Sequence, residues 1–285
     1  MERSMWAEFK PAGTTNFMPE KPPLYILKIG GSVATQKTKN AFETNAKLLV
    51  QIAEQIKKAM DQKFFSLIVV NGAGPFGHMN VINYNINNGI ESGKNFEGFC
   101  KTVADCSRIN LVVSYALQKA GIKSYPLPSS SVVIQENKKI KQFSTVLIES
   151  LLQLRVVPVM NGTMCPDTKI RGSVVSGDAI IAYLAKQFNA SAVFMGADVD
   201  GIMTADPKQD PDAKLIPEIN RKNFSEVMKS VGGASTADVT GGMKGKIEKL
   251  KDAFPGRRVV VFNASSPENV FRALTGEKIG TEILF

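Results

Sequence analysis

The feature of this sequence that most limits its possible folds is the alternation of short apolar runs with longer segments of helical periodicity. The run SLIVV at 66–70 has the character of a buried strand and continues straight into a glycine-rich turn. Strands that alternate with helices in this way are typical of a parallel sheet with helices on both faces. The expected strands are 24–30, 66–71, 155–160, 191–196, 257–263 and 279–285, with a short strand and hairpin region at 123–143, and the expected helices are 42–61, 96–120, 144–153, 176–188 and 240–250.

No linker-like segment interrupts the alternation, so we expect two lobes that share one continuous sheet. The length of 285 residues and the hydrophobic content of 44% suit a large α/β domain, whose core is large enough to be stable without disulfide bonds or bound metal. Residues 1–23 contain Pro11, Pro19, Pro22 and Pro23 and show little periodicity. They are therefore expected to form a flexible arm.

The composition disfavours several classes of protein. No apolar run approaches the ~20 residues of a membrane span, and the amino-terminal segment lacks the apolar stretch of a secretion signal. The cysteines Cys100, Cys106 and Cys165 form no CxxC pair, which argues against a disulfide framework or a zinc site and favours a reducing cytoplasm. The net charge of +9 is spread along the chain without a basic, aromatic-containing arm, so nucleic-acid binding is not expected.

The single histidine, His78, ends the glycine-rich turn NGAGPFGH. Residues 72–77 match the dinucleotide fingerprint G-x-G-x-x-G, which requires a helix that begins at the turn and an acidic residue ~20 positions further on. Residues 81–90 are rich in asparagine and Glu91 follows no strand, so a nicotinamide cofactor is not expected. The glycine N–H groups can still bind phosphate, although no Walker P-loop is present. His78 is then either an ordinary polar residue or a phosphate ligand.

Charged residues stand beside several other glycine turns. Lys28 lies in the first apolar strand, two positions before GGS at 30–32, and needs a partner unless the strand end meets water. Asp178 opens a predicted helix, where it is either a simple cap or a functional carboxylate. The segment TGGMKGK at 240–246 marks another helix start and a possible anion site, unless Lys246 only occupies a solvated face. Together these residues suit phosphoryl transfer, in which lysines neutralise the moving group and a carboxylate orients them.

Six segments in order along the chain resemble the amino acid kinase superfamily: LKIGGS, NGAGPFGH, SGDAIIAYLA, ADVDGIMTADP, DVTGGMKGKI and RALTGEKIGTEI. Within the superfamily, the GxFGH turn and the DVDG and DVTGGM segments resemble the isopentenyl phosphate kinase branch. The resemblance implies an α/β fold, an open αβα sandwich with a largely parallel central sheet. It also implies an acceptor-substrate lobe at 24–165, an ATP-binding lobe at 166–285 and, as is usual in the family, a homodimer.

The resemblance further implies roles for individual residues. Lys28 and Lys246 match the catalytic lysines that stabilise the transferred phosphoryl group, and Asp178 matches the carboxylate that organises them. The acceptor phosphate is matched by His78, Gly72, Ala73, Gly74, Gly77 and Gly162. The ATP-binding positions are matched by Lys28, Gly30, Gly31, Ser32, Lys37, Asp198, Asp200, Gly201, Thr204, Asp206, Gly242 and Lys246. The implied reaction is the ATP- and Mg²⁺-dependent conversion of isopentenyl phosphate to isopentenyl diphosphate in the cytoplasm, with no metal ligand assigned to the protein and no nucleic-acid or membrane partner.

Three positions depart from the family pattern. Asn71 stands where histidine is usual, Pro75 where serine or alanine is usual, and Thr163 where an aspartate is expected after Gly162. Other acceptors therefore stay open, namely a fosfomycin-type phosphonate, a carboxylate or a nucleoside monophosphate, as does a non-catalytic nucleotide- or oxyanion-binding protein. The apolar residues around the glycine turn either pack in the core or favour a five-carbon tail: Phe76, Met79, Val81, Ile82, Ile86, Ile90, Phe96 and Phe99.

Overall fold

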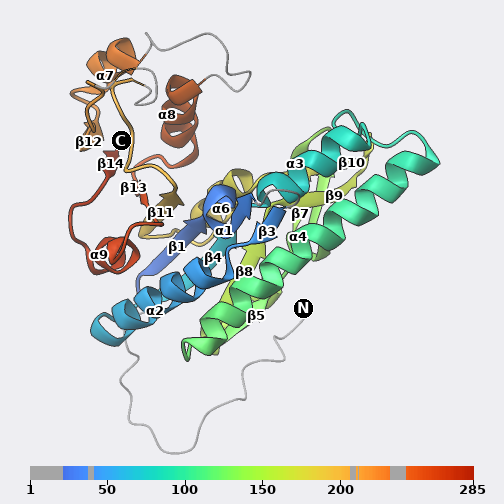
Figure 1. The fold of residues 1–285 in the computed structure, drawn as a ribbon, viewed down its shortest axis with the longest axis horizontal. Helices are drawn as coiled ribbons and strands as arrows, with labels where there is room; N and C mark the ends of the chain where they lie inside the picture. Colours follow the sequence, from blue (N-terminus) through green and yellow to red (C-terminus); the bar gives the residue numbers. More distant parts are fainter. Residues whose placement is uncertain (1–21, 38–41, 206–209, 211, 232–241) are drawn as a thin grey trace, which may run out of the picture.

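An eight-stranded, mainly parallel sheet runs through the part of the chain that the structure describes. The computed structural model describes residues 22–37, 42–205, 210, 212–231 and 242–285, and of residues 37, 42, 242–246 and 249 it describes the backbone alone. The strand order is β12-β14-β13-β11-β1-β4-β8-β5, with only the described pair β13–β14 antiparallel (Figure 1). These strands are β1 (Leu24–Ile29), β4 (Ser66–Asn71), β5 (Ser124–Pro126), β8 (Val157–Asn161), β11 (Ala192–Ala197), β12 (Glu218–Asn220), β13 (Arg258–Asn263) and β14 (Thr281–Leu284).

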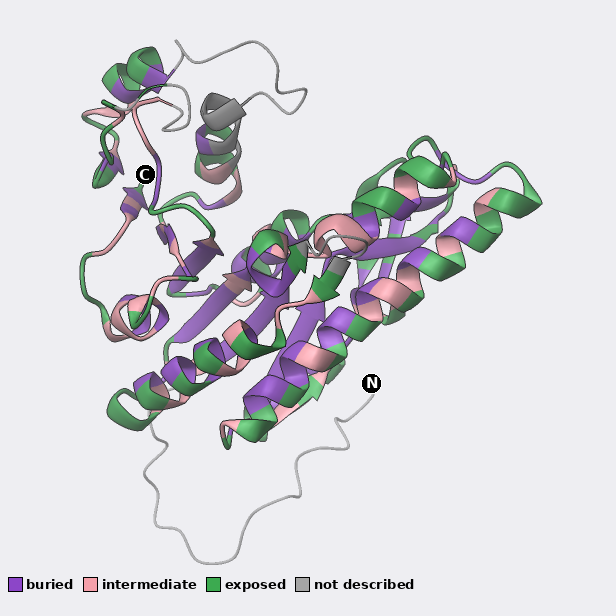
Figure 2. Cartoon of the chain, in the orientation of Figure 1, coloured by how far each residue is buried: buried purple, intermediate pink, exposed green. Residues whose placement is uncertain are grey.

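Helices cover both faces of this sheet. The side chains of β1 alternate between two cores, because Leu24 and Ile26 belong to one and Tyr25 and Leu27 to the other. Buried residues of α2, α4 and α9 line one core, and those of α5, α6, α7 and α8 line the other. The central strands β1, β4, β8 and β11 are accordingly buried along almost their whole length, while the long helices are buried on one side only (Figure 2). The helices are α1 (Gly31–Ala34), α2 (Ala46–Gln62), α3 (Gly74–Asn83), α4 (Gly93–Lys119), α5 (Val146–Gln153), α6 (Gly177–Gln187), α7 (Phe224–Ser230), α8 (Gly242–Ala253) and α9 (Asn269–Thr275). The expected αβα sandwich with one continuous sheet is therefore confirmed.

Two small sheets extend from this framework. The first has the order β10-β9-β6-β7 and contains β6 (Val133–Glu136), β7 (Lys139–Phe143), β9 (Thr163–Asp167) and β10 (Arg171–Val175). The second pairs β2 (Thr35–Lys37) with β3 (Phe42–Thr44). The tips of the two hairpins β6–β7 and β9–β10 share one buried carboxylate, Asp167. It accepts hydrogen bonds from the backbone N–H groups of Asn137 (3.0 Å), Lys138 (2.8 Å), Lys169 (2.9 Å) and Ile170 (3.2 Å).

Several expected elements differ from the observed ones. The helix expected over 42–61 begins at Ala46, because residues 42–44 pair with β2. The turn at 72–77 does open into a helix, α3, which the asparagine-rich segment had not led us to expect. The helix is short and leads into a second helix instead of crossing to a neighbouring strand. The hairpin at 163–175 was also missed, since its mixture of polar and apolar residues hides the strand period. No helix of the described residues is long and apolar enough to cross a membrane.

Candidate active site

The turns that follow β1 and β4 touch at the carboxyl edge of the sheet. A side-chain carbon on Gly31 would lie 2.5 Å from the backbone nitrogen of Gly74, and one on Gly72 would lie 2.6 Å from that of Gly31. Gly74 also has φ of +54°, a left-handed conformation that disfavours other residues. Glycine is therefore required where the two turns meet. Anionic ligands commonly bind at this edge of a parallel sheet.

Lys28 and Asp178 form an ion pair beside these turns. The Lys28 Nζ atom lies 2.5 Å from Asp178 Oδ1, with 21% of the lysine and 62% of the aspartate side chain exposed. Asp178 lies in the first turn of α6, and the helix is capped instead by Ser176, whose side chain accepts from the Ala179 N–H at 3.1 Å. Lys28 thus has the partner that its place in an apolar strand requires. The carboxylate, free of a capping role, fixes the ammonium group at the site.

The end of β8 joins the same edge. The Gly162 N–H donates to the Asn71 carbonyl at 3.0 Å, which links β8 to the end of β4. A side-chain carbon on Gly162 would lie 3.0 Å from the backbone nitrogen of Gly177, the first residue of α6. The acceptor-phosphate glycines predicted at 72–74 and 162 therefore meet beside the helix that carries Asp178.

His78 lies one turn into α3 and is exposed. The helix starts at Gly74, with Pro75 in its first turn, where the missing N–H costs no helical hydrogen bond. The substitution of serine or alanine by Pro75 is thus compatible with the helix. Gly77 is buried, and a side-chain carbon there would lie 2.8 Å from Ala73 Cβ and 3.5 Å from Cys106 Sγ. A larger residue at Gly77 would therefore collide with Ala73 at the start of α3.

The predicted nucleotide residues follow β11 at the same edge of the sheet. Asp198 and Asp200 are exposed, and Asp200 Oδ1 accepts a hydrogen bond from Asn263 Nδ2 at 3.0 Å. Gly201 has φ of +154°, and a side-chain carbon there would lie 2.6 Å from Leu215 Cδ1. Thr204 Oγ1 accepts from the Lys214 N–H at 2.9 Å, which closes this loop upon itself.

The remaining predicted residues are only partly described. Asp206 and the segment 232–241 lie outside the described residues. Lys37 is the last residue of β2 and Lys246 belongs to α8, but their side chains also lie outside the description, and Gly242 is the first residue of α8. Gly30 is bonded to β11, with its N–H donating to the Gly196 carbonyl at 2.8 Å, and Ser32 is exposed beside it in α1. The structure therefore brings together Lys28, the glycine turns, Asp178 and the residues after β11.

Sequence reasoning missed a set of buried polar residues under the glycine turns. Asn71, Asn161 and Asn110 have no exposed surface, and Thr163 is 2% exposed. Burial raises the pKa of the Cys106 thiol to about 12, although the neighbouring Thr163 side chain acts in the opposite direction. Burial likewise raises the pKa of Cys165 to about 12. Neither thiol is ionised at neutral pH, so neither is a nucleophile. Sequence reasoning missed Asn110 because an asparagine in a helical pattern gives no signal of burial.

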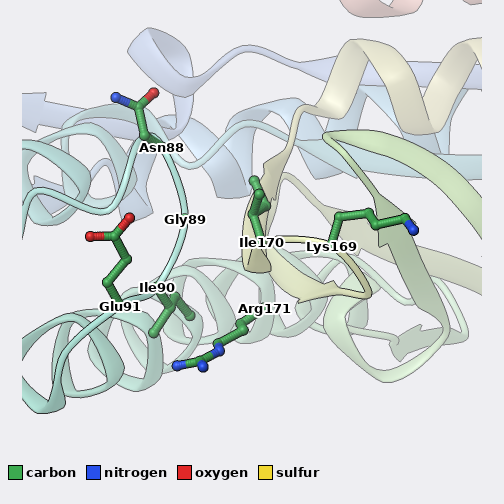
Figure 3. Close-up of a pocket in the computed structure, with 7 residues that line it drawn as sticks. All are labelled: Asn88, Gly89, Ile90, Glu91, Lys169, Ile170 and Arg171. Carbon is green, nitrogen blue, oxygen red and sulfur yellow. The ribbon is translucent and has the colours of Figure 1, made fainter.

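The apolar residues around the turn divide into two groups. Ile86 and Ile90 are buried, whereas Met79, Ile82 and Phe96 are 41%, 69% and 47% exposed. The latter three are thus not part of the packed core. A pocket of about 280 Å³ lies between the loop at 88–91 and the tip of the β9–β10 hairpin, where Gly89 approaches Ile170 (Figure 3). Neither glycine turn contributes to its lining.

The residues present fit a magnesium ion that arrives with a nucleotide. Among the described residues, no group of three or more His, Cys, Asp or Glu could hold a metal ion. Mg²⁺ usually keeps several waters and binds through one or two carboxylates together with substrate phosphates. An exposed carboxylate, that of Asp178, is present at the site, where it pairs with Lys28.

The chain is similar to known kinases over most of its length. Residues 23–263 match the model of the amino acid kinase family. The isopentenyl phosphate kinase of Methanothermobacter thermautotrophicus is 35% identical over 268 residues, which are 91% of this chain and 98% of the relative. The isopentenyl phosphate kinase of Methanocaldococcus jannaschii is 34% identical over 269 residues, which are 92% of this chain and 99% of the relative.

Solved structures agree with these sequence matches. A structure described as isopentenyl phosphate kinase superimposes with a TM-score of 0.76 at 32% identity, and the match covers 91% of this chain and 99% of the other. The product complex of the T. acidophilum isopentenyl phosphate kinase gives a TM-score of 0.70 at 25% identity, with the same coverage of 91% and 99%.

Proposed function

The chain belongs to the amino acid kinase family, and we propose that it transfers the γ-phosphoryl group of ATP to isopentenyl phosphate, giving isopentenyl diphosphate and ADP. The observation that carries the proposal is the Lys28–Asp178 pair, 2.5 Å apart, beside the glycine turns at 72–74 and 162. The nearly full-length match to relatives with this name supports the choice of acceptor. A purely binding protein of the same fold would have no need of this pair.

The proposed reaction is a direct displacement at the γ-phosphorus atom. An oxygen of the acceptor phosphate forms the new bond, while the bond between the γ-phosphorus and the bridging oxygen breaks and ADP leaves with that electron pair. Negative charge is shared by the leaving oxygen and the equatorial oxygens in the transition state. Lys28 is proposed to neutralise this charge, held in place by Asp178, with Lys246 as a second cation. Fixed charges of this kind act mainly on the transition state and so raise turnover.

The acceptor phosphate is proposed to bind at Gly72, Ala73, Gly74, Gly77 and Gly162. His78, exposed one turn into the helix that starts at Gly74, can donate an imidazole N–H to a phosphate oxygen. Thr163 supports this assignment, because a hydroxyl beside Gly162 does not repel a dianion as a carboxylate would. The five-carbon tail is proposed to bind against apolar side chains near the turn, where it gains ~0.8 kcal/mol per buried methylene.

The nucleotide is proposed to bind along Asp198, Asp200, Gly201 and Thr204, with Gly30, Gly31, Ser32, Lys37, Asp206, Gly242 and Lys246. Bound together with ATP, Mg²⁺ supplies positive charge that offsets the phosphate oxygens. On this proposal residues 24–165 form the acceptor lobe and residues 166–285 the nucleotide lobe.

We further propose a cytoplasmic homodimer. Cys100, Cys106 and Cys165 are all unpaired, which is compatible with a reducing compartment. Exposed aromatic residues on α4 and on the edge strand β5, Tyr115 (58% exposed) and Tyr125 (43% exposed), support a second copy at this edge of the sheet. Light scattering coupled to size exclusion measures the assembly directly.

A panel of acceptors tests the proposed function. ADP release is measured with isopentenyl phosphate, dimethylallyl phosphate, fosfomycin, UMP and glutamate. We expect the highest kcat/KM with isopentenyl phosphate, weaker turnover with dimethylallyl phosphate and little with fosfomycin. A preference for fosfomycin, UMP or glutamate contradicts the acceptor but not the kinase, whereas no ADP release with any acceptor favours a binding protein.

His78 provides a separate test of the acceptor site. His78→Ala is expected to raise the KM for isopentenyl phosphate by about tenfold, the effect of losing one charge-assisted hydrogen bond, and to leave the KM for ATP nearly unchanged. Steady-state kinetics with each substrate varied in turn separate the two constants. An unchanged acceptor KM means that His78 is an ordinary surface residue.

A further inference from the structure

Helix α4 presents a row of buried polar or small side chains to the sheet. Thr102, Cys106, Asn110 and Ser114 follow one another at intervals of four residues, so they lie along one face of the helix. Their exposures are 1%, 0%, 0% and 0%. The hydrophobic effect alone would favour leucine or valine at these positions, and the polar side chains therefore require another reason.

Asn110 is the member of this row that reaches the site. Its Nδ2 atom donates to Asn71 Oδ1 at 3.2 Å and to the Val159 carbonyl at 2.9 Å. Asn71 is the last residue of β4, and Val159 lies in β8, the neighbouring strand. One amide group of the helix therefore holds two adjacent strands just before their glycine turns begin.

The bonds continue from this amide into both turns. Asn71 Nδ2 donates to the Gly72 carbonyl at 3.2 Å, and the Gly162 N–H donates to the Asn71 carbonyl at 3.0 Å. Asn161, paired with Asn71 across the sheet, lies within hydrogen-bond distance of the Gly162 carbonyl at 3.4 Å. The position of Gly72 relative to Gly162 therefore depends on the Asn71 side chain that Asn110 holds.

Asn110 lowers the stability of the fold, so stability cannot be the reason for an asparagine at this position. Its Oδ1 atom is buried and has no hydrogen-bond partner among the described residues. An unsatisfied buried carbonyl is destabilising, while an apolar side chain of the same shape would avoid this cost. Residues that break a local stability rule in this way are expected at functional sites.

Three buried side chains beneath the glycine turns carry no charge. Asn71 and Thr163 are neutral, and Cys106, one turn earlier on α4, stays protonated at neutral pH. A side-chain carbon on Gly77, in the helix that carries His78, would lie 3.5 Å from Cys106 Sγ. The buried face of α4 thus places neutral side chains beneath the turn at 72–74 and Gly162, whereas the Asp105 carboxylate, next to Cys106, accepts a hydrogen bond from Asn80 Nδ2 of α3 at 2.8 Å.

From these contacts we infer that Asn110 is a positioning residue for the acceptor phosphate: it fixes the ends of β4 and β8 so that the turns at 72–74 and 162 present one site. The inference rests on the proposed function for its kinetic consequence, although the effect on the turns does not depend on which acceptor binds. Asn110 itself lies beneath the turns and does not touch the substrate.

The test compares Asn110→Leu with Ser114→Ala. Ser114 is equally buried one turn further along α4, but its bonds lead to Ser124 of the edge strand β5 at 2.9 and 3.0 Å, away from the site. In Asn110→Leu we expect kcat/KM for the acceptor to fall about 10- to 100-fold, because small displacements of bound reactants have effects of this size. The KM for ATP is expected to change little. Ser114→Ala is expected to keep both constants.

Amide hydrogen exchange provides a readout that does not depend on activity. The Gly72 N–H donates to the Ile29 carbonyl at 2.9 Å, and the Gly162 N–H donates to Asn71, so both amides report on the turns. In Asn110→Leu their exchange is expected to accelerate by about tenfold or more while amides of β11 and α9 keep their protection, as expected for local opening. If Asn110→Leu does not fold, Asn110→Ser, whose shorter side chain cannot reach both partners, replaces it.

A double-mutant cycle with Asn71→Leu measures whether Asn110 acts through the Asn71 side chain. Because one hydrogen bond joins the two side chains, the double variant is expected to lose at least about threefold less kcat/KM than the product of the single effects. Independent effects, or exchange at Gly72 and Gly162 equal to that of Ser114→Ala, overturn the inference. If the wild-type protein does not phosphorylate isopentenyl phosphate, the proposed function fails. The exchange measurement then decides the inference alone, and accelerated exchange confined to the two turns supports it.

Discussion

The proposed acceptor side of the site, residues 72–77 with 162–163, and the proposed nucleotide side, residues 198–204 with 263, are built in different ways. On the acceptor side, backbone lies against backbone, since a side-chain carbon on Gly31 or Gly72 would approach the facing turn to 2.5 or 2.6 Å. On the nucleotide side, Asp198 and Asp200 project as exposed side chains, with Asp200 bonded to Asn263 at 3.0 Å.

The difference concerns when conformational freedom is lost. The acceptor side is already fixed by glycine contacts and by buried amide groups before any ligand arrives, so binding there orders little. Exposed side chains on the nucleotide side must be ordered on binding, at about 0.5–1.5 kcal/mol for each one. We therefore expect changes on the acceptor side to act steeply and together, and changes on the nucleotide side to act weakly and one at a time.

The strongest test of this contrast is Gly31→Ala, because Gly31, although proposed to bind the nucleotide, is the residue against which the acceptor turn packs. The added carbon cannot be accommodated unless the turns after β1 and β4 separate, so we expect activity to fall by more than about 10³-fold, beyond a small misplacement. Circular dichroism and thermal unfolding show whether the sheet survives. Gly93→Ala is the matched control, because a side-chain carbon there meets nothing within 4 Å and the residue begins α4. Near-normal turnover in Gly31→Ala would contradict the proposal that the acceptor side is more rigidly built than the nucleotide side.

A smaller but still large effect is expected for Asp178→Asn. Loss of the charge that orients Lys28 is expected to lower kcat by about 10²–10³-fold while the KM for ATP changes little. Asp61→Asn serves as control, since Asp61 forms an ion pair of the same length, 2.5 Å, with Lys57 at an exposed position of α2. Equal kinetics in the two variants would show that the Lys28–Asp178 pair has only a structural role.

The third prediction concerns stability in the acceptor half. Burial alone would raise the pKa of Asp167, but the N–H groups of Lys138, Lys169 and Ile170 and the hydroxyl of Ser173 outweigh it and hold the pKa below its usual range. Asp167→Asn is expected to lower the free energy of unfolding at pH 7 by about 2–4 kcal/mol, since charged hydrogen bonds are replaced by poorer ones.

The pH dependence of this effect has a definite sign. The ionised carboxylate stabilises the folded state fully above the unfolded pKa of about 3.9, and this contribution is lost as the pH falls below that value toward the folded pKa. The difference between wild type and Asp167→Asn in urea unfolding should be constant from pH 7 to about pH 5 and shrink below about pH 4. Glu136→Gln, on the same hairpin, is the control: Lys141 lowers the pKa of Glu136, but that carboxylate is exposed and no measurable change is expected. A difference that grows toward low pH would contradict the assignment.

The smallest effect is expected on the nucleotide side. Asn263→Ala removes the bonds to Asp200 and to the Ser265 N–H, and we expect the KM for ATP to rise less than about tenfold with kcat within twofold, because exposed hydrogen bonds contribute little. Acceptor KM and thermal stability should stay at wild-type values. A loss as large as that of Asp178→Asn would show that the nucleotide side is as rigidly built as the acceptor side.

The sequence predicts the central architecture because its signals are local. The apolar run of β4 indicates a buried strand, and the glycines that follow it indicate a close backbone approach. Lys28 in the apolar strand β1 indicates a charged partner. Buried polar positions give no such signal. Asn110 has the appearance of a surface residue in a helix, and Asp167 that of a loop residue, because their partners come from distant segments. Met79, by contrast, has an apolar side chain that the fold leaves 41% exposed. Pairings across the chain, not local preferences, decide these cases.

The place of β1 in the sheet also sets the order in which the fold can form during synthesis. One edge of β1 pairs with β4, which follows it closely, but on the other edge Tyr25 pairs with Ala192 of β11. A ribosome therefore releases β1, β4, β5 and β8 well before β11 exists. Until that moment the growing chain exposes an apolar strand edge of the kind that recruits chaperones or aggregates. The last third of the polypeptide thus protects the first strand as well as completing the site.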